Sequence, residues 1–98
     1  MQLDFNHKKD FLKYVSLQKK MRTIKLIWDF VGDNTEGTAD HYAIHLREYL
    51  ESKKYENYPV GFEKLTPDHA IAFMIIPEDK VIELRDALRP QRGAIVSN

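Results

Sequence analysis

Two histidines and a glutamate form the densest group of side chains that could bind a metal. His41 and His45 are four residues apart, and Glu48 follows three residues later. In a helix, residues three and four apart share a face, so two imidazoles can reach one metal ion. The more common explanation of such a face is contact with solvent, and the His-Glu-x-x-His motif that would supply a general base is absent. Metal binding by His41, His45 and Glu48 is therefore kept as an alternative.

Asp29 is the candidate residue for acid–base chemistry. It lies in a predicted strand that runs from Thr23 to Phe30, and the period-two pattern turns it away from the main apolar face. A carboxyl group buried beside apolar side chains has a raised pKa and can act as a general acid or base. The simpler alternative is that Asp29 caps the next loop or pairs with Lys25 on the same face.

Other catalytic and nucleic-acid motifs are weak. Two glycines separated by four residues resemble a phosphate-binding loop, but Thr38 stands where lysine is needed, and Asp33 and Glu36 repel a phosphate. None of the three serines lies in a Gly-x-Ser-x-Gly turn. The third predicted strand carries Phe73 as its one aromatic residue, whereas an RNA-recognition strand carries several aromatics and a basic residue.

Composition narrows the class of protein further. A chain of 98 residues, 43% hydrophobic and 31% charged, fits one domain. Cysteine is absent, which excludes disulfides and thiolate ligands and predicts a cytoplasmic protein. The first 20 residues carry five lysines against Asp4 and Asp10, a net charge of +3, so the other 78 sum to −3. A mildly acidic body without long apolar stretches predicts neither a nucleic-acid nor a membrane partner, and no cofactor is expected.

The elements that position these residues follow from hydrophobic periodicity. Residues 1–20 read as a helical appendage to a domain over 21–98. After the strand ending at Phe30, a helix is expected from an N-cap at Thr38 to about Lys53, with an apolar stripe. Further elements are expected in this order: strands over 58–65 and 70–76, a helix starting at Pro77 and ending before Pro90, and a short strand over 93–96.

The order strand, helix, strand, strand, helix and strand resembles the ferredoxin-like α+β fold. This resemblance implies an antiparallel sheet with both helices on one face and the first and third strands at its centre. On the open face we expect Lys25, Ile27 and Asp29, beside one of two sets from the third strand. That set is either Ala70, Ala72, Met74 and Ile76 or the alternate residues. Such a face is too apolar to remain exposed to solvent, so the N-terminal helix or a second copy of the chain is expected to cover it.

Three functions follow as hypotheses. The first is a small non-catalytic protein that forms a homodimer or binds a small ligand through the open face, with Lys25, Ile27, Asp29 and Met74 as ligand-binding residues. The second is a cofactor-independent enzyme, similar in architecture to the dimeric α+β barrels, in which Asp29 or a histidine moves a proton. The third is the metal-binding protein described above.

Overall fold

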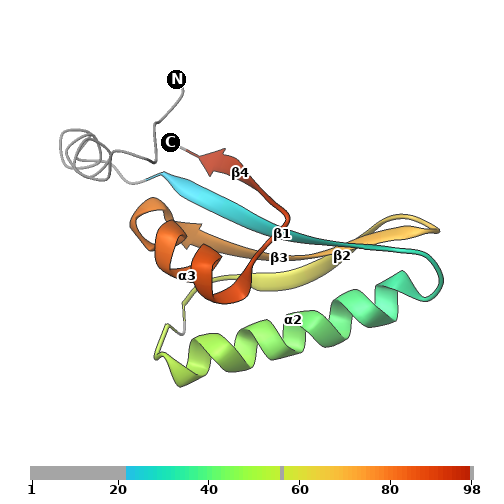
Figure 1. Ribbon diagram of the computed structural model, residues 1–98, viewed down its shortest axis with the longest axis horizontal. Coiled ribbons are helices and arrows are strands. Elements are labelled where there is room, and N and C mark those ends of the chain that lie inside the picture. The colour runs from blue at the N-terminus through green and yellow to red at the C-terminus, as the bar shows by residue number, and fades with distance from the viewer. Residues whose placement is uncertain (1–21, 56, 98) are drawn as a thin grey trace.

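The computed structural model describes residues 22–55 and 57–97 and shows an α+β fold. Figure 1 shows its strands and helices, labelled and coloured in chain order. Their bounds are β1 Thr23–Val31, α2 Thr35–Ser52, β2 Val60–Thr66, β3 His69–Pro77, the 3₁₀ turn η1 Glu78–Lys80, α3 Val81–Leu88 and β4 Arg92–Ser97. The helix expected over 1–20 lies outside the described residues.

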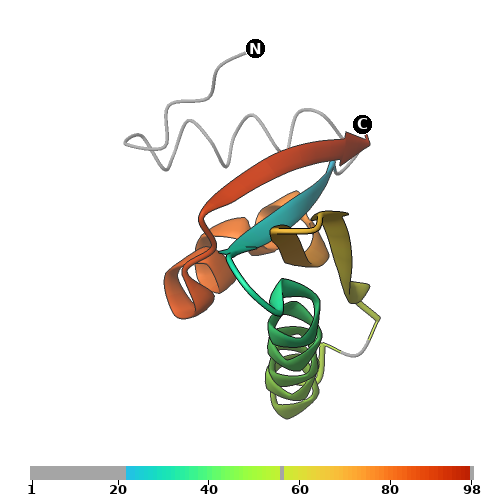
Figure 2. The ribbon, with the colours of Figure 1, turned by 90° about the vertical axis from the view of Figure 1, so that its right-hand side faces the viewer.

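The four strands form one antiparallel sheet in the order β2-β3-β1-β4. The prediction that the first and third strands are central is confirmed, and β2 and β4 form the two edges. Both α2 and α3 lie on the same face of the sheet (Figure 2). In the described part of the chain, no helix has the length and apolar character needed to cross a membrane.

The core lies between this face and the helices. From β1, Leu26 and Trp28 point into it, and they meet the stripe that α2 contributes. The indole Nε1–H of Trp28 donates a hydrogen bond to the carbonyl oxygen of Leu88 at 2.9 Å, which ties the end of α3 to the central strand. The predicted helix stripe is confirmed by the buried residues Ala39, Ala43, Leu46 and Leu50.

The start of α2 differs from the prediction. The helix begins at Thr35, and its N-cap is Asn34 in the left-handed region with φ 54°, so Thr38 is not the cap. The Thr38 hydroxyl instead donates to the Asn34 carbonyl oxygen at 3.1 Å. Gly37 permits this turn, because a Cβ there would lie 2.8 Å from Oδ1 of Asn34. The sequence pattern assigned Gly37 to a loop, whereas local packing places it inside the helix.

The second helix also starts later than predicted. Pro77 is the last residue of β3 and has an extended ψ of 151°, so it does not open the helix. A 3₁₀ turn intervenes, and its Glu78 N–H donates to the carbonyl oxygen of Arg22 at 2.9 Å. The helix ends at Leu88, where Arg89 takes a left-handed φ of 50° ahead of Pro90. The short last strand is confirmed with slightly wider bounds.

Candidate functional site

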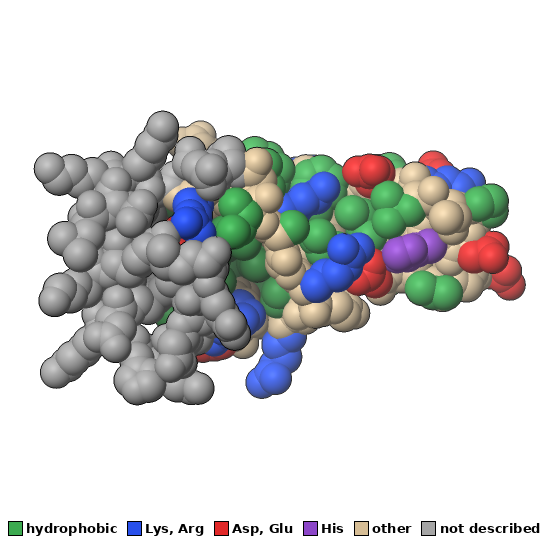
Figure 3. Space-filling model, turned by 90° about the horizontal axis from the view of Figure 1, so that it is seen from above, with side chains coloured by type: hydrophobic (Ala, Val, Ile, Leu, Met, Phe, Trp, Pro, Cys, Tyr) green, Lys and Arg blue, Asp and Glu red, His purple; other side chains and the backbone are tan. Residues whose placement is uncertain are grey.

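The face of the sheet opposite the helices, here called the open face, carries three of the predicted ligand-binding residues. Because β1 alternates, Lys25, Ile27 and Asp29 lie on the side away from the core. Figure 3 looks onto this side and shows hydrophobic side chains next to basic, acidic and histidine side chains. The cross-strand neighbours of the three residues on β3 are Ile75, Phe73 and Ile71, respectively.

Met74 does not share the open face, so its prediction as a ligand-binding residue is wrong. It pairs with Leu26, lies in the core under the helices and is 0% exposed. Directly paired residues of an antiparallel sheet point to the same side, so the register with β1 decides the orientation of every residue in β3. The alternate set of β3 residues therefore occupies the open face.

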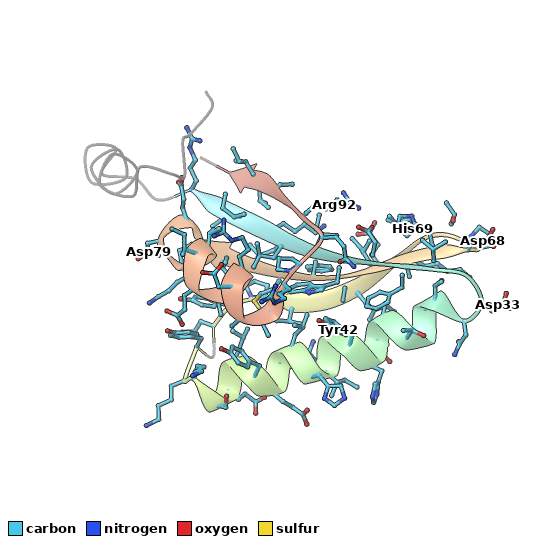
Figure 4. The ribbon with its side chains drawn as sticks, viewed as in Figure 1. Asp33, Tyr42, Asp68, His69, Asp79 and Arg92 are labelled. Atoms are coloured by element: carbon cyan, nitrogen blue, oxygen red, sulfur yellow. The ribbon has the colours of Figure 1, made fainter. Side chains whose placement is uncertain are left out.

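A polar group that we call the Asp29 cluster joins three strands on the open face. It consists of Asp29 from β1, His69 from β3 and Arg92 from β4. Oδ1 of Asp29 lies 2.8 Å from Nε2 of His69, and the Arg92 guanidinium donates from Nε to Oδ2 and from Nη2 to Oδ1, each at 3.0 Å. Figure 4 shows His69 and Arg92 on the same side of the sheet, with Tyr42 on the other side. This two-pronged contact fixes the plane of the carboxylate.

Backbone contacts hold the start of β4 in the position that this cluster requires. Oε1 of Gln91 accepts a hydrogen bond from the backbone N–H of Asp29 at 3.1 Å. The backbone N–H of Gln91 donates to the carbonyl oxygen of Ile27 at 3.0 Å. The connection from α3 to β4 is therefore anchored on β1 one residue before Arg92. As a result, the guanidinium reaches Asp29 from the neighbouring strand.

The charge of Asp29 is set by its partners. The hydrogen bond from Arg92 lowers the pKa of Asp29 from 3.8 to about 2, with His69 adding to the effect and partial burial opposing it. The raised pKa expected from an apolar environment is therefore not found, because a cation contacts the carboxylate. The expected pairing with Lys25 is replaced as well, since the Lys25 ammonium lies 4.5 Å from the ring centroid of Phe73.

The Asp29 cluster can hold and orient an imidazole. An ionised carboxylate bound to one ring nitrogen fixes the ring and leaves the other nitrogen to exchange protons. For His69 that other nitrogen is Nδ1, for which the described residues provide no hydrogen-bond partner. The geometry thus makes His69 the group that can move a proton and Asp29 the residue that positions it.

Sequence reasoning missed both partners of Asp29. His69 falls in the gap between the strands predicted over 58–65 and 70–76, and Arg92 lies one residue before the strand predicted over 93–96. The sequence did carry a signal for His69. When the first and third strands pair in antiparallel orientation, the start of the third strand, near His69, lies beside the end of the first, near Asp29. No local pattern identified Arg92, which is 63 residues from Asp29 in the chain.

The histidines of α2 lie elsewhere, on the exposed side of that helix. Nε2 of His41 and Nε2 of His45 are 3.0 Å apart, and Nδ1 of His45 lies 3.1 Å from Oε1 of Glu48. Glu48 thus contacts the nitrogen of His45 that His41 does not. Within residues 22–55 and 57–97, no three metal-ligating side chains converge on a single point.

The fold and these contacts define a class: a small α+β protein with a four-stranded antiparallel sheet and a polar cluster on the face opposite its helices. The chain matches no protein-family model, no curated protein and no solved structure.

Proposed function

We propose that this chain is a non-catalytic binding module of ferredoxin-like topology that holds a small amphipathic anion on its open face. The strand order supports this topology. β1 and β2 are joined through α2 and have β3 between them in the sheet. β3 and β4 are joined through α3 and have β1 between them. These are two split crossovers of the kind that characterises the ferredoxin-like arrangement.

The observation that carries the proposal is the apolar floor beside charged groups on one face. Ile27 and Ile71 lie at the base of this floor and are 4% and 3% exposed, so the apolar surface that a ligand can reach is the partly buried Phe73. Lys25 lies over Phe73, and the Asp29 cluster adjoins the floor at Asp29. An apolar ligand body fits against Phe73, and an anionic group fits beside the Lys25 ammonium. Sites of this type combine apolar lining with a few polar groups that fix orientation.

A fluorescent amphipathic anion, 8-anilinonaphthalene-1-sulfonate, tests this proposal on the full chain. We expect saturable binding that weakens about two- to fivefold in Lys25→Gln, the loss typical of an exposed cation–aromatic or ion-pair contact. Lys53→Gln is the matched control, because Lys53 lies over the Tyr49 ring on another surface. Binding that does not saturate, or that Lys53→Gln weakens as much as Lys25→Gln does, contradicts the proposal.

A homodimer that closes the same face stays a prediction from the sequence. Light scattering behind a sizing column gives the mass directly. A dimer would place the ligand between two open faces, whereas a monomer would leave it on one.

A second candidate, the cofactor-independent enzyme, is favoured by the contact between Asp29 and His69. An imidazole with one nitrogen held by a carboxylate can act as a base through the other. With p-nitrophenyl acetate, an activated ester that reports a reactive imidazole, we expect cleavage above the buffer rate that His69→Gln removes and His41→Gln retains. An acceleration that survives in His69→Gln excludes this candidate.

A further inference from the structure

The exposed side of α2 presents two imidazoles in contact. Nε2 of His41 lies 3.0 Å from Nε2 of His45, and the rings meet edge to face with centroids 4.5 Å apart. The His45 side chain is 60% exposed, so a solvated ion can reach the pair. This surface is separate from the open face and has no part in the function proposed above.

Glu48 determines which nitrogen of His45 is available. Its carboxylate can only accept, so the hydrogen on His45 belongs at Nδ1, 3.1 Å from Oε1. The lone pair of His45 is then on Nε2 and accepts the Nε2–H of His41. When His41 carries its hydrogen on Nδ1 instead, both Nε2 lone pairs are free to bind the same ion. A carboxylate on the far nitrogen of a ligating histidine is a common support of metal sites.

The spacing favours particular metals. With metal–nitrogen distances of about 2.0–2.1 Å, two nitrogens 3.0 Å apart subtend an angle of about 90° at the metal. This is the angle between adjacent ligands in square-planar and octahedral complexes, which Cu²⁺ and Ni²⁺ form with imidazole. Ca²⁺ and Mg²⁺ prefer oxygen ligands and do not fit.

The charge of the helix also favours a cation. The acidic residues of α2 are Glu36, Asp40, Glu48 and Glu51, and its one basic residue, Arg47, donates to the carbonyl oxygen of Val60 on β2. We propose that His41 and His45 chelate Cu²⁺ or Ni²⁺ through their Nε2 atoms, with Glu48 as the positioning residue of His45 and water at the other coordination positions.

Titration of the full chain with Cu²⁺ against a weak competing chelator tests this site. We expect one ion per chain, and an affinity at least about tenfold lower in His41→Ala and in His45→Ala, because each variant loses one of two protein ligands. The visible absorption band of the bound ion should shift in both variants as a nitrogen is lost. His7→Ala is the control and should leave affinity and spectrum unchanged.

Glu48 requires a separate pair of variants. Glu48→Ala should lower the affinity, whereas Glu48→Gln should retain most of it because its carbonyl oxygen still accepts from Nδ1 of His45. His41, His45 and Glu48 are exposed, so circular dichroism should show wild-type folding of their variants; glutamine replaces alanine at either histidine if it does not. Wild-type affinity in both His41→Ala and His45→Ala, or a lower affinity in the control than in these variants, overturns the proposal.

Discussion

Replacing Met74 by alanine is expected to lower the free energy of unfolding by about 2–5 kcal/mol. The Met74 side chain is fully buried between β3 and the helices, so its removal leaves a cavity as well as losing apolar burial. For a small domain with a total stability of about 5–15 kcal/mol, this is a large fraction. Urea denaturation followed by circular dichroism measures the change.

The matched control for Met74 is its neighbour on the opposite face of the same strand. Ile75 is only partly buried, so Ile75→Ala should cost less than Met74→Ala. The reverse order of the two costs would mean that Met74, not Ile75, faces outward. Such a result would contradict the register of β3 and with it the placement of the open face.

Replacing Asp29 by asparagine is expected to destabilise the protein by about 1–2 kcal/mol at neutral pH. The folded-state pKa of Asp29 is about 2, below the ordinary value of 3.8, because Arg92 and His69 stabilise the carboxylate. A carboxyl group whose pKa is lowered in the folded state stabilises the protein at pH values above its ordinary pKa of 3.8. That stabilisation is lost as the pH falls through the folded-state pKa of about 2. The shift itself corresponds to a little over about 2 kcal/mol, and the expected range lies below that value to allow for solvent screening at the partly exposed carboxylate.

The pH dependence separates this effect from a general loss of packing. Urea unfolding of the wild type and Asp29→Asn should differ most above pH 4, and the difference should shrink as the pH falls from about 4 towards 2. Asp40→Asn, on the exposed side of α2, is the control and should change stability by less than about 0.5 kcal/mol. A difference between wild type and Asp29→Asn that is constant over this range would mean that the ionised carboxylate does not stabilise the fold.

The sequence by itself determined the elements and the buried stripes. Alternation in β1 separated Leu26 and Trp28 from Lys25 and Asp29, and the helical spacing of α2 identified its buried side. Both patterns are local, because they depend only on the period of strand or helix. The proximity of His41 and His45 is local for the same reason, since both belong to one helix. The helix starts were less predictable: the N-cap of α2 is Asn34 in the left-handed region, and the lack of a side chain at Gly37 leaves room for the Asn34 side chain.

Tertiary structure alone decided the rest. All residues from 70 to 76 are apolar, so their alternation could not show which side of β3 faces the helices; pairing with β1 did, and it placed Met74 inside. Asp29 acquired partners 40 and 63 residues away, His69 and Arg92, which arrive from two different strands. The direction of its pKa shift depends on whether a cation or only apolar residues surround the carboxylate. That choice is made by the sheet register and the α3 to β4 connection, and no local spacing in the chain encodes it.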